Sequence, residues 1–245
     1  MALLGAGEFE SWHGPVDAWL RSRVGGDGPV LIAPTASAAE GDDVFASWAA
    51  KGLDHYGRLG IPAQVLPLKT REDASREDVV AQLDGASAVF FSGGNPWYLS
   101  KVLVGTAFWQ RMCQRVDAGD LAYAGCSAGV ACLTEVTYDS DADDFDRVFQ
   151  QGLGYVRDVL FAPHWDMIDT WVEGARTAIT ASIAPGGTLV GIDERTAVLG
   201  DGSAWRVEGV AAVHVYRDGV WVDHADGDGF ALELFPAASK EARSL

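Results

Sequence analysis

The chain has 245 residues, of which 48% are hydrophobic, and its formal net charge at pH 7 is -17. A surface with this much negative charge repels phosphate backbones, so we expect no nucleic-acid partner. The length is sufficient to bury a large core, and we predict a single α/β domain over residues 1–245.

The remaining composition argues against membrane and secreted classes. The three cysteines (Cys113, Cys126 and Cys132) lack the spacing of a metal site, and their low, odd number suits a reducing compartment. The N-terminus enters a strand-like run without the charged and apolar segments of a signal peptide. No apolar run approaches the roughly 20 residues of a membrane-spanning helix. We therefore expect a cytoplasmic protein without a membrane partner.

The first third of the chain alternates short apolar runs with helical patterns. The apolar runs predict strands at residues 1–4, 29–33, 63–68 and 86–91. Helices are predicted over residues 17–24 and 42–59 and, after a capping-box pattern at 75–78, from residue 79 onward. Strands that alternate with helices indicate βαβ units, so we predict an α/β fold with a mainly parallel sheet flanked by helices.

A glycine pair follows the strand at 86–91, in the run Ser92-Gly93-Gly94-Asn95-Pro96. Asn95 is expected to cap a helix that begins at Pro96, and further helical patterns cover residues 97–104 and 108–117. Ligands gather at the carboxyl ends of parallel strands, where the N–H group of Gly93 or Gly94 is unshielded by a side chain. Residues 5–8 lack the full glycine fingerprint of a nucleotide loop and are expected to form a turn.

Residues 121–133 carry the most informative pattern of the chain. A short apolar run leads into Gly125-x-Ser127-x-Gly129, and residues that can continue as a helix follow. This is the pattern of a nucleophile elbow, in which glycines let the chain turn sharply and the serine hydroxyl stands exposed. The helix N-terminus, with the N–H of Ala128, would then face an anionic intermediate. An ordinary glycine-rich turn fits the same five residues equally well.

Residues 138–147 form an acidic stretch. Asp139, Asp141 and Asp143 have the spacing that begins a calcium loop, but the sixth position is Asp144 instead of glycine. We predict no metal here. The stretch is either a solvated loop or a rim that attracts cationic substrates.

A second pair of candidate residues follows two later strands. Residues 159–162 predict a strand, and His164 comes just after it, where it could act as a base at the same sheet edge as Ser127. The strand at 188–192 is followed by Asp193-Glu194-Arg195, a place where an acid can orient a histidine. The alternative for this turn is an ion pair between Glu194 and Arg195.

The other patterns of the C-terminal half concern the fold. A helix is predicted over residues 169–183, with Trp171, Val172, Ala175 and Ile179 facing inward. Short alternating segments follow from residue 196, with a hairpin turn at Asp218-Gly219. They predict an antiparallel β appendage to the sheet.

Four motifs in this order carry a resemblance. They are Ser-Gly-Gly-Asn at 92–95, Gly-Cys-Ser-Ala-Gly-Val at 125–130, Ala-Pro-His at 162–164 and Gly-Ile-Asp-Glu-Arg-Thr-Ala-Val at 191–198. Together they resemble the cyanophycinase and aspartyl dipeptidase (dipeptidase E) family of serine peptidases, and the similarity spans nearly the whole chain. The resemblance implies a class I glutamine-amidotransferase-like, flavodoxin-like fold and a Ser-His-Glu triad.

The family's roles can be carried over to the matching residues. The resemblance implies that Ser127 is the nucleophile, His164 the general base and Glu194 the acid that orients it. It also implies that the N–H groups of Gly94 and Ala128 form the oxyanion hole. The reaction needs no cofactor. The expected substrate is a small peptide, cleaved at a dipeptide or isopeptide bond.

Some features leave the specificity and the chemistry open. Asn95-Pro96 replaces the Asp-Gln that usually follows the glycine pair in cyanophycinases, and no arginine occurs at 165–170. We expect Asn95 to contact the substrate. The alternatives are a cysteine-dependent amidohydrolase that uses Cys126, a non-catalytic binding protein, and a metal hydrolase that uses His164 and Asp166. A homodimer is the oligomer to test first.

Overall fold

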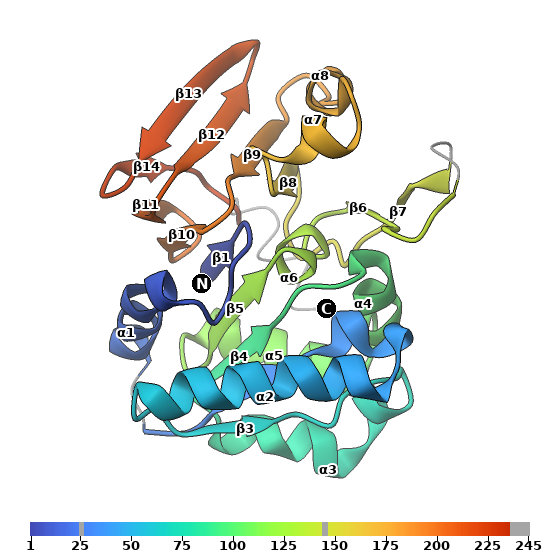
Figure 1. Cartoon of the computed structure of the whole chain (residues 1–245), viewed down its shortest axis with the longest axis vertical. Coiled ribbons are helices and arrows are strands. Elements are labelled where there is room, and N and C mark those ends of the chain that lie inside the picture. The colour runs from blue at the N-terminus through green and yellow to red at the C-terminus, as the bar shows by residue number, and fades with distance from the viewer. Residues whose placement is uncertain (25–26, 144–146, 236–245) are drawn as a thin grey trace.

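The computed structural model describes residues 1–24, 27–143 and 147–235, and a large sheet runs through it (Figure 1). In spatial order its eight described strands are β14 (Gly229–Ala231), β11 (Ala204–Gly209), β10 (Thr196–Gly200), β1 (Ala2–Leu4), β5 (Ala122–Cys126), β4 (Ala88–Phe91), β2 (Val30–Ala33) and β3 (Ala63–Val65). The five from β1 to β3 are parallel, and β10, β11 and β14 continue antiparallel beyond β1. The predicted α/β class is confirmed.

The central parallel strands are apolar at both faces. Every residue of β1, β2, β4 and β5 is buried, whereas the edge strand β3 is partly exposed and shorter than predicted. A parallel strand covered by helices on both faces needs apolar side chains on both, which explains the continuous apolar runs in the sequence.

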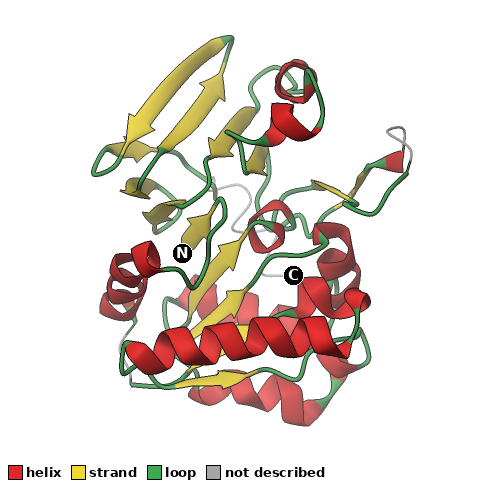
Figure 2. Ribbon diagram, in the orientation of Figure 1, coloured by secondary structure: helices red, strands yellow, loops and turns green. Residues whose placement is uncertain are grey.

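Helices lie on both faces of the large sheet (Figure 2). They are α1 (Gly14–Arg23), α2 (Asp42–Arg58), α3 (Glu77–Val80), α4 (Pro96–Leu103) and α5 (Ala107–Ala118), with short 3-10 turns η1 (Ser11–His13), η2 (Thr35–Glu40), η3 (Asp73–Ser75) and η4 (Ala81–Gly85). Side chains of α1 and α2 share a core with Leu4 and Ile32, and those of α3, α4 and α5 share one with Leu3 and Leu31. Neighbouring strand residues point to opposite faces, so each strand serves both cores.

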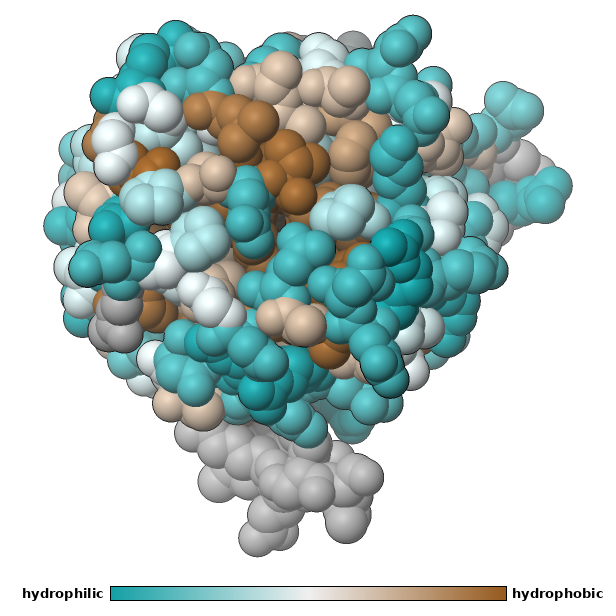
Figure 3. Space-filling model, turned by 90° about the horizontal axis from the view of Figure 1, so that it is seen from below, coloured by the Kyte–Doolittle hydropathy of each residue, from teal (hydrophilic) through white to brown (hydrophobic). Residues whose placement is uncertain are grey.

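The outer surface of this half meets solvent. Seen from below, hydrophilic residues surround a smaller hydrophobic group near the middle of the face (Figure 3). Within the described ranges, no helix is long and apolar enough to cross a membrane.

A second sheet carries the later part of the chain. Its four described strands, in spatial order, are β13 (Val220–Ala225), β12 (Ala212–Arg217), β9 (Thr188–Ile192) and β8 (Val159–Pro163). We expected the strand before His164, β8, to end at the same sheet edge as Ser127, and this was wrong, because β8 lies in this second sheet beside β9. These two strands pair with each other in parallel, and the hairpin β12–β13 adds to β9. Asp218 and Gly219 form its turn with positive φ angles of 50° and 84°.

Two helix predictions also differ from the structure. The predicted helix at 169–183 is broken into α7 (Ile168–Trp171) and α8 (Ala175–Ala181), because Gly174 adopts a left-handed φ of 77°. Trp171 and Val172 are 60% and 51% exposed, so their predicted inward orientation was wrong, whereas Ile179 is partly buried against Trp165 and Leu189. The capping box at 75–78 was wrong as well, since Ser75 ends η3 and Arg76 occupies the N-cap of α3 without a side-chain bond.

The acidic stretch lies between two short strands, β6 (Val136–Tyr138) and β7 (Phe149–Gln151), which form an antiparallel ribbon. Its residues 144–146, with Asp144, are outside the described part of the chain.

Candidate active site

The predicted elbow is a tight turn between β5 and the short helix α6 (Ala128–Ala131). Ser127 sits at its apex with φ 50° and ψ -104°. A Cβ atom on Gly125 would lie 2.3 Å from the carbonyl oxygen of Gly129, and one on Gly129 would lie 2.6 Å from that of Phe91. Real Cβ atoms do not approach so closely, so both glycines are required by the turn. The helix that follows is only one turn long, so its dipole contributes less than predicted.

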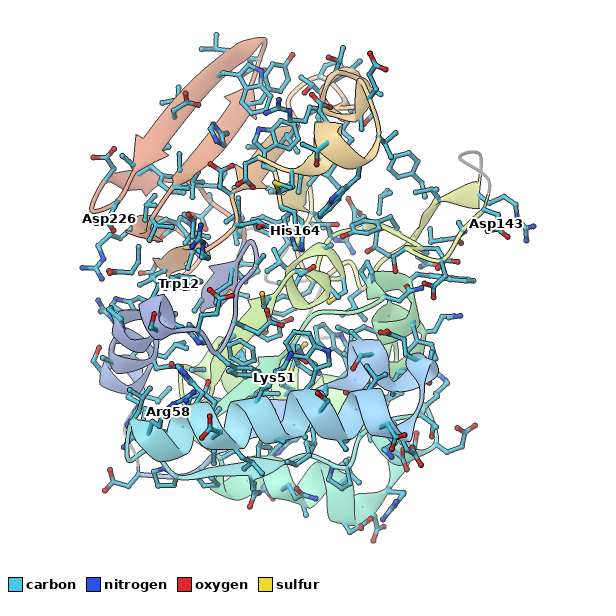
Figure 4. The ribbon with its side chains drawn as sticks, viewed as in Figure 1. Trp12, Lys51, Arg58, Asp143, His164 and Asp226 are labelled. Carbon is cyan, nitrogen blue, oxygen red and sulfur yellow. The ribbon has the colours of Figure 1, made fainter. Side chains whose placement is uncertain are left out.

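His164 connects the two other residues of the predicted triad. Its Nε2 atom is 2.9 Å from the Ser127 hydroxyl oxygen, and its Nδ1 atom is 2.8 Å from Oε1 of Glu194. The side chains come from the two sheets, and Figure 4 shows His164 between the upper sheet and the elbow below it. The structure thus brings together three residues separated by up to 67 positions in the sequence. One ring nitrogen of His164 contacts the hydroxyl and the other contacts the carboxylate, as a general base requires.

The turn that carries Glu194 is held by a neighbouring carboxylate. The backbone N–H of Glu194 donates to Oδ1 of Asp166 at 3.0 Å. Among the described contacts, the ion-pair partner of Glu194 is His164 and not Arg195. Arg195 has a left-handed φ of 52°, and its N–H donates to Ala6 O at 3.1 Å. Asp166 therefore fixes the acid that contacts the histidine, a role different from the metal ligand considered above.

The two backbone N–H groups predicted to form an oxyanion hole belong to Gly94 and Ala128. Within the described residues, the N–H groups of Gly94 and Ala128 donate to no protein acceptor. The N–H of Gly93 is not free, because it donates to Oε1 of Glu8 at 2.8 Å. Gly94 has a φ of 139°, and a Cβ atom there would lie 2.5 Å from the backbone of Ala36. Of the glycine pair, Gly94 is therefore the one whose N–H can receive a ligand.

Cys126 is an unfavourable nucleophile. Its side chain is fully buried, and its thiol donates to Oε2 of Glu8 at 3.0 Å. Burial, and then the neighbouring negative charge of Glu8, raise the pKa of the Cys126 thiol well above its usual value. Because the thiolate is the reactive form, this environment favours Ser127 over Cys126.

Three side chains near the triad were missed by the sequence analysis. Glu8 is in the turn predicted at residues 5–8, but no local pattern marks its carboxylate as part of a site. Burial raises the pKa of Tyr138 to about 12, and a hydrogen bond with Ser127 opposes that rise. The ring of Trp171 lies 5.1 Å from that of His164, centroid to centroid. The exposed indole therefore forms part of the approach to the histidine.

Asn95 is held on all sides. Its side-chain oxygen accepts from the N–H of Tyr98 at 3.0 Å, which is the predicted helix cap. Its amide nitrogen donates to Asp139 at 2.6 Å and to Asp141 at 2.8 Å, so it anchors the acidic stretch to the glycine turn. These contacts support a positioning role, and the predicted contact of Asn95 with substrate stays a prediction.

The described residues include one group with the spacing of metal ligands. His13, Asp17 and His55 offer ligand atoms within 4.8 Å of one another, and all three are buried. Oδ2 of Asp17 already bonds Nε2 of His55 at 2.7 Å, and the N–H of Phe9 points to Nδ1 of His13 at 3.4 Å. Burial lowers the pKa of His13 to about 4. These three side chains form a buried hydrogen-bonded network between η1, α1 and α2.

Comparison with known proteins identifies the family. The model described as "Peptidase family S51" matches residues 1–207. The chain belongs to peptidase family S51. This confirms the family resemblance found in the sequence.

Individual relatives add detail. A cyanophycinase from Nostoc sp. is 27% identical over 147 residues, which are 58% of this chain and 48% of that protein. A cyanophycinase from Synechococcus elongatus is 30% identical over 185 residues, which are 71% of this chain and 56% of that protein. The chain thus spans about half the length of these curated relatives.

Solved structures show the same fold. The crystal structure of a peptidase from an acI-B1 actinobacterium superposes with a TM-score of 0.81 at 26% identity, covering 94% of this chain and 96% of that one. A putative peptidase E from Listeria monocytogenes superposes with a TM-score of 0.58 at 17% identity, covering 91% and 96%. The second similarity concerns the fold alone.

Proposed function

We propose that this chain is a serine-type peptidase that hydrolyses small peptides through Ser127, His164 and Glu194. One observation carries the proposal, the pair of bonds that join His164 Nε2 to Ser127 Oγ at 2.9 Å and His164 Nδ1 to Glu194 Oε1 at 2.8 Å. Membership of family S51 and the names of the cyanophycinase and peptidase relatives support a peptide substrate, and the target that we propose is a dipeptide or isopeptide bond.

The reaction is an acyl transfer to water. The Ser127 oxygen attacks the peptide carbonyl carbon while His164 Nε2 takes the hydroxyl proton. The N–H groups of Gly94 and Ala128 stabilise the resulting oxyanion. His164 then gives the proton to the leaving amine as the C–N bond breaks. Water attacks the acyl-enzyme with the same histidine as base, and the carboxylic acid and free Ser127 are released.

The orientation of the base follows from its second bond. Glu194 accepts from Nδ1–H, which leaves Nε2 as the acceptor that faces Ser127. As His164 gains a proton during attack, the carboxylate next to it stabilises the imidazolium form. Glu194 is 37% exposed, so solvent screens part of this effect.

A fluorophosphonate probe tests the proposal on the intact chain. Wild-type protein and Cys126→Ala are expected to label, and Ser127→Ala is expected to lose labelling and to lose peptide turnover by about 10⁴-fold or more. Both variants remove only a small side-chain atom, so thermal midpoints verify that they fold. Labelling that survives Ser127→Ala, or disappears in Cys126→Ala, would assign the chemistry to the cysteine. A folded wild type that neither labels nor cleaves any member of a dipeptide library supports the binding-protein alternative.

A further inference from the structure

The turn after β1 touches both halves of the candidate site. At the end of the strand, Leu4 O accepts from the N–H of Ser127 at 3.0 Å. Two residues later, Ala6 O accepts from the N–H of Arg195 at 3.1 Å, next to the triad acid. Residues 5–8 therefore lie between the elbow and the turn that carries Glu194, and Glu8 is the side chain that this turn directs toward the site.

Glu8 is a buried carboxylate with two donors. It is 9% exposed, and it accepts from the N–H of Gly93 at 2.8 Å and from the thiol of Cys126 at 3.0 Å. Within the described residues, no lysine or arginine pairs with it. A buried carboxylate without a cation is unfavourable unless hydrogen bonds satisfy it. Both of its oxygens are satisfied by groups next to the predicted nucleophile and oxyanion donors.

The backbone is strained so that Glu8 reaches this place. Phe9 has a left-handed φ of 66°, which is costly for a bulky residue, and its N–H points to Nδ1 of His13 at 3.4 Å. Its ring enters the core, 4.8 Å from that of Phe90 in β4. The carboxylate of Glu8 accepts from the N–H of Gly93, in the turn that follows β4. Strain of this kind is kept where a site depends on it.

The carboxylate fixes the glycine turn beside Ser127. A Cβ atom on Gly93 would lie 3.4 Å from Oε1 of Glu8 and 3.6 Å from Cβ of Ser127, so both side chains border the same glycine. The bond to Glu8 sets the direction of the Gly93 N–H. On the other side of the turn, the N–H of Asn95 donates to Ala36 O at 2.9 Å. Between these two bonds, only the N–H of Gly94 is left to face a substrate.

We propose that Glu8 is a positioning residue for the oxyanion hole, whose carboxylate clamps the Gly93 N–H and so aims the Gly94 N–H. This inference rests on the function proposed above. Glu8 acts through the Gly94 N–H, which binds the oxyanion most strongly in the transition state. We therefore expect Glu8 to affect the rate of attack on a bound substrate far more than it affects substrate binding.

The test uses a fluorophosphonate probe and separates the maximal rate of Ser127 modification from the probe concentration at half-maximal rate. In this modification Ser127 Oγ bonds to phosphorus, fluoride leaves, and His164 takes the hydroxyl proton. Loss of one oxyanion donor costs about 100- to 1000-fold, so Glu8→Ala is expected to lower the maximal rate about 100-fold with little change in half-saturation. Glu8→Gln should restore most of the rate, because its amide oxygen can accept from Gly93. Glu10→Gln and Glu10→Ala, at an exposed glutamate two residues away, are the matched controls.

The outcomes separate this inference from the proposed function. If wild type labels at Ser127 and Glu8→Ala labels equally fast, the clamp is wrong and the peptidase proposal stands. If wild type does not label, or Ser127→Ala still does, the proposed function fails first. Equal losses in Glu8→Gln and Glu8→Ala also overturn the clamp, since the charge would then matter instead of the hydrogen bond. If Glu8→Ala does not fold, Glu8→Asp replaces it, because the shorter side chain keeps the charge but loses the reach to Gly93.

Discussion

The large sheet and the second sheet contribute different halves of the candidate site. The large sheet presents Ser127 and the N–H groups of Gly94 and Ala128 beyond the ends of β4 and β5. The second sheet presents His164 and Glu194 just beyond β8 and β9. The proposed proton acceptor, His164, and the proposed nucleophile, Ser127, thus belong to different sheets and meet only in the folded chain.

The two halves are built differently. On the large sheet, close backbone approach is achieved with glycines, and Cys126, Ala128 and Glu8 are buried around the serine. On the second sheet, His164 itself adopts a left-handed φ of 56°, and the side chains of His164 and Glu194 are 20% and 37% exposed. The nucleophile half is fixed by packing, whereas the acid half depends on a few hydrogen bonds near solvent. The bond between His164 and Glu194 is therefore the contact of the second sheet whose loss should matter most.

The largest expected effect on that half comes from Glu194→Gln. The amide can present its N–H₂ group to Nδ1 and so favour the histidine tautomer with its proton on Nε2, which cannot accept the serine proton. In a fully buried triad this change lowers the catalytic rate about 10⁴-fold. Because Glu194 is partly exposed, we expect a loss of about 10³-fold in the rate of labelling by the fluorophosphonate probe, or about 4 kcal/mol. Glu233→Gln is the control, since it makes the same change at a glutamate near the C-terminal end. A labelling rate within about 3-fold of wild type would show that His164 needs no carboxylate partner.

The difference between the halves also explains what the sequence could reveal. Gly125, Gly129 and Gly94 are required by backbone geometry, so they leave a local pattern that pointed to Ser127, Ala128 and one N–H group of the 93–94 glycine pair. His164 and Glu194 follow strands, but the left-handed positions there are His164 itself and Arg195, so no glycine marks them in the sequence. Their places after strands made them candidates, the order of four motifs implied their roles, and the bonds from His164 to Ser127 and Glu194 needed the structure.

Other features could not be predicted because they depend on contacts between distant segments. Glu8 lies 85 residues before Gly93 and 118 before Cys126, and nothing in its neighbourhood of the sequence marks it as buried. The prediction that β8 ends at the same sheet edge as Ser127 failed because an apolar run does not say which strand it pairs with. The helix at 169–183 failed because a single glycine, Gly174, interrupts an otherwise helical pattern.

The pH dependence of stability should differ between the halves. Burial lowers the pKa of His13, behind the large sheet, to about 4, against about 6.5 in an unfolded chain. Between these values the unfolded state binds more protons than the folded state. Stability is therefore lost as pH falls from about 6.5 toward 4, by up to about 3 kcal/mol. Urea unfolding of wild type at pH 7 and pH 5 should show this loss, and His13→Gln should reduce the dependence on pH.

His214, in β12 of the second sheet, has the opposite sign. A hydrogen bond to Asp193, and then one to Asp223, raise the pKa of His214, and burial opposes them. Its contribution is present at low pH and is lost as pH rises through the raised pKa. Amide hydrogen exchange should therefore show protection falling first around α1 and α2 on acidification, while β12 and β13 remain protected. Equal loss in both regions would contradict the contrast. His224→Gln is the control for His13→Gln, because it makes the same change at a histidine outside both clusters.

The smallest effect is expected from Asp166→Ala. Asp166 touches neither Ser127 nor the oxyanion donors, and its described contact is the bond from the Glu194 N–H at 3.0 Å. Its removal lets the acid turn shift, and small misplacements of catalytic groups reduce rates by up to about 100-fold, so we expect about a 10-fold lower labelling rate. Asp54→Ala, at an exposed ion pair on α2, should have no effect.

The same variant decides between the serine mechanism and a metal held by His164 and Asp166. A metal ligand is indispensable, so in that mechanism Asp166→Ala would abolish peptide turnover, and a chelator would inhibit the wild type. In the serine mechanism the chelator has no effect, and the partial loss in Asp166→Ala adds little to that of Glu194→Gln, because both changes act through one hydrogen-bonded unit. A double variant that loses the full product of the two single effects would show that Asp166 acts on the reaction by a separate route.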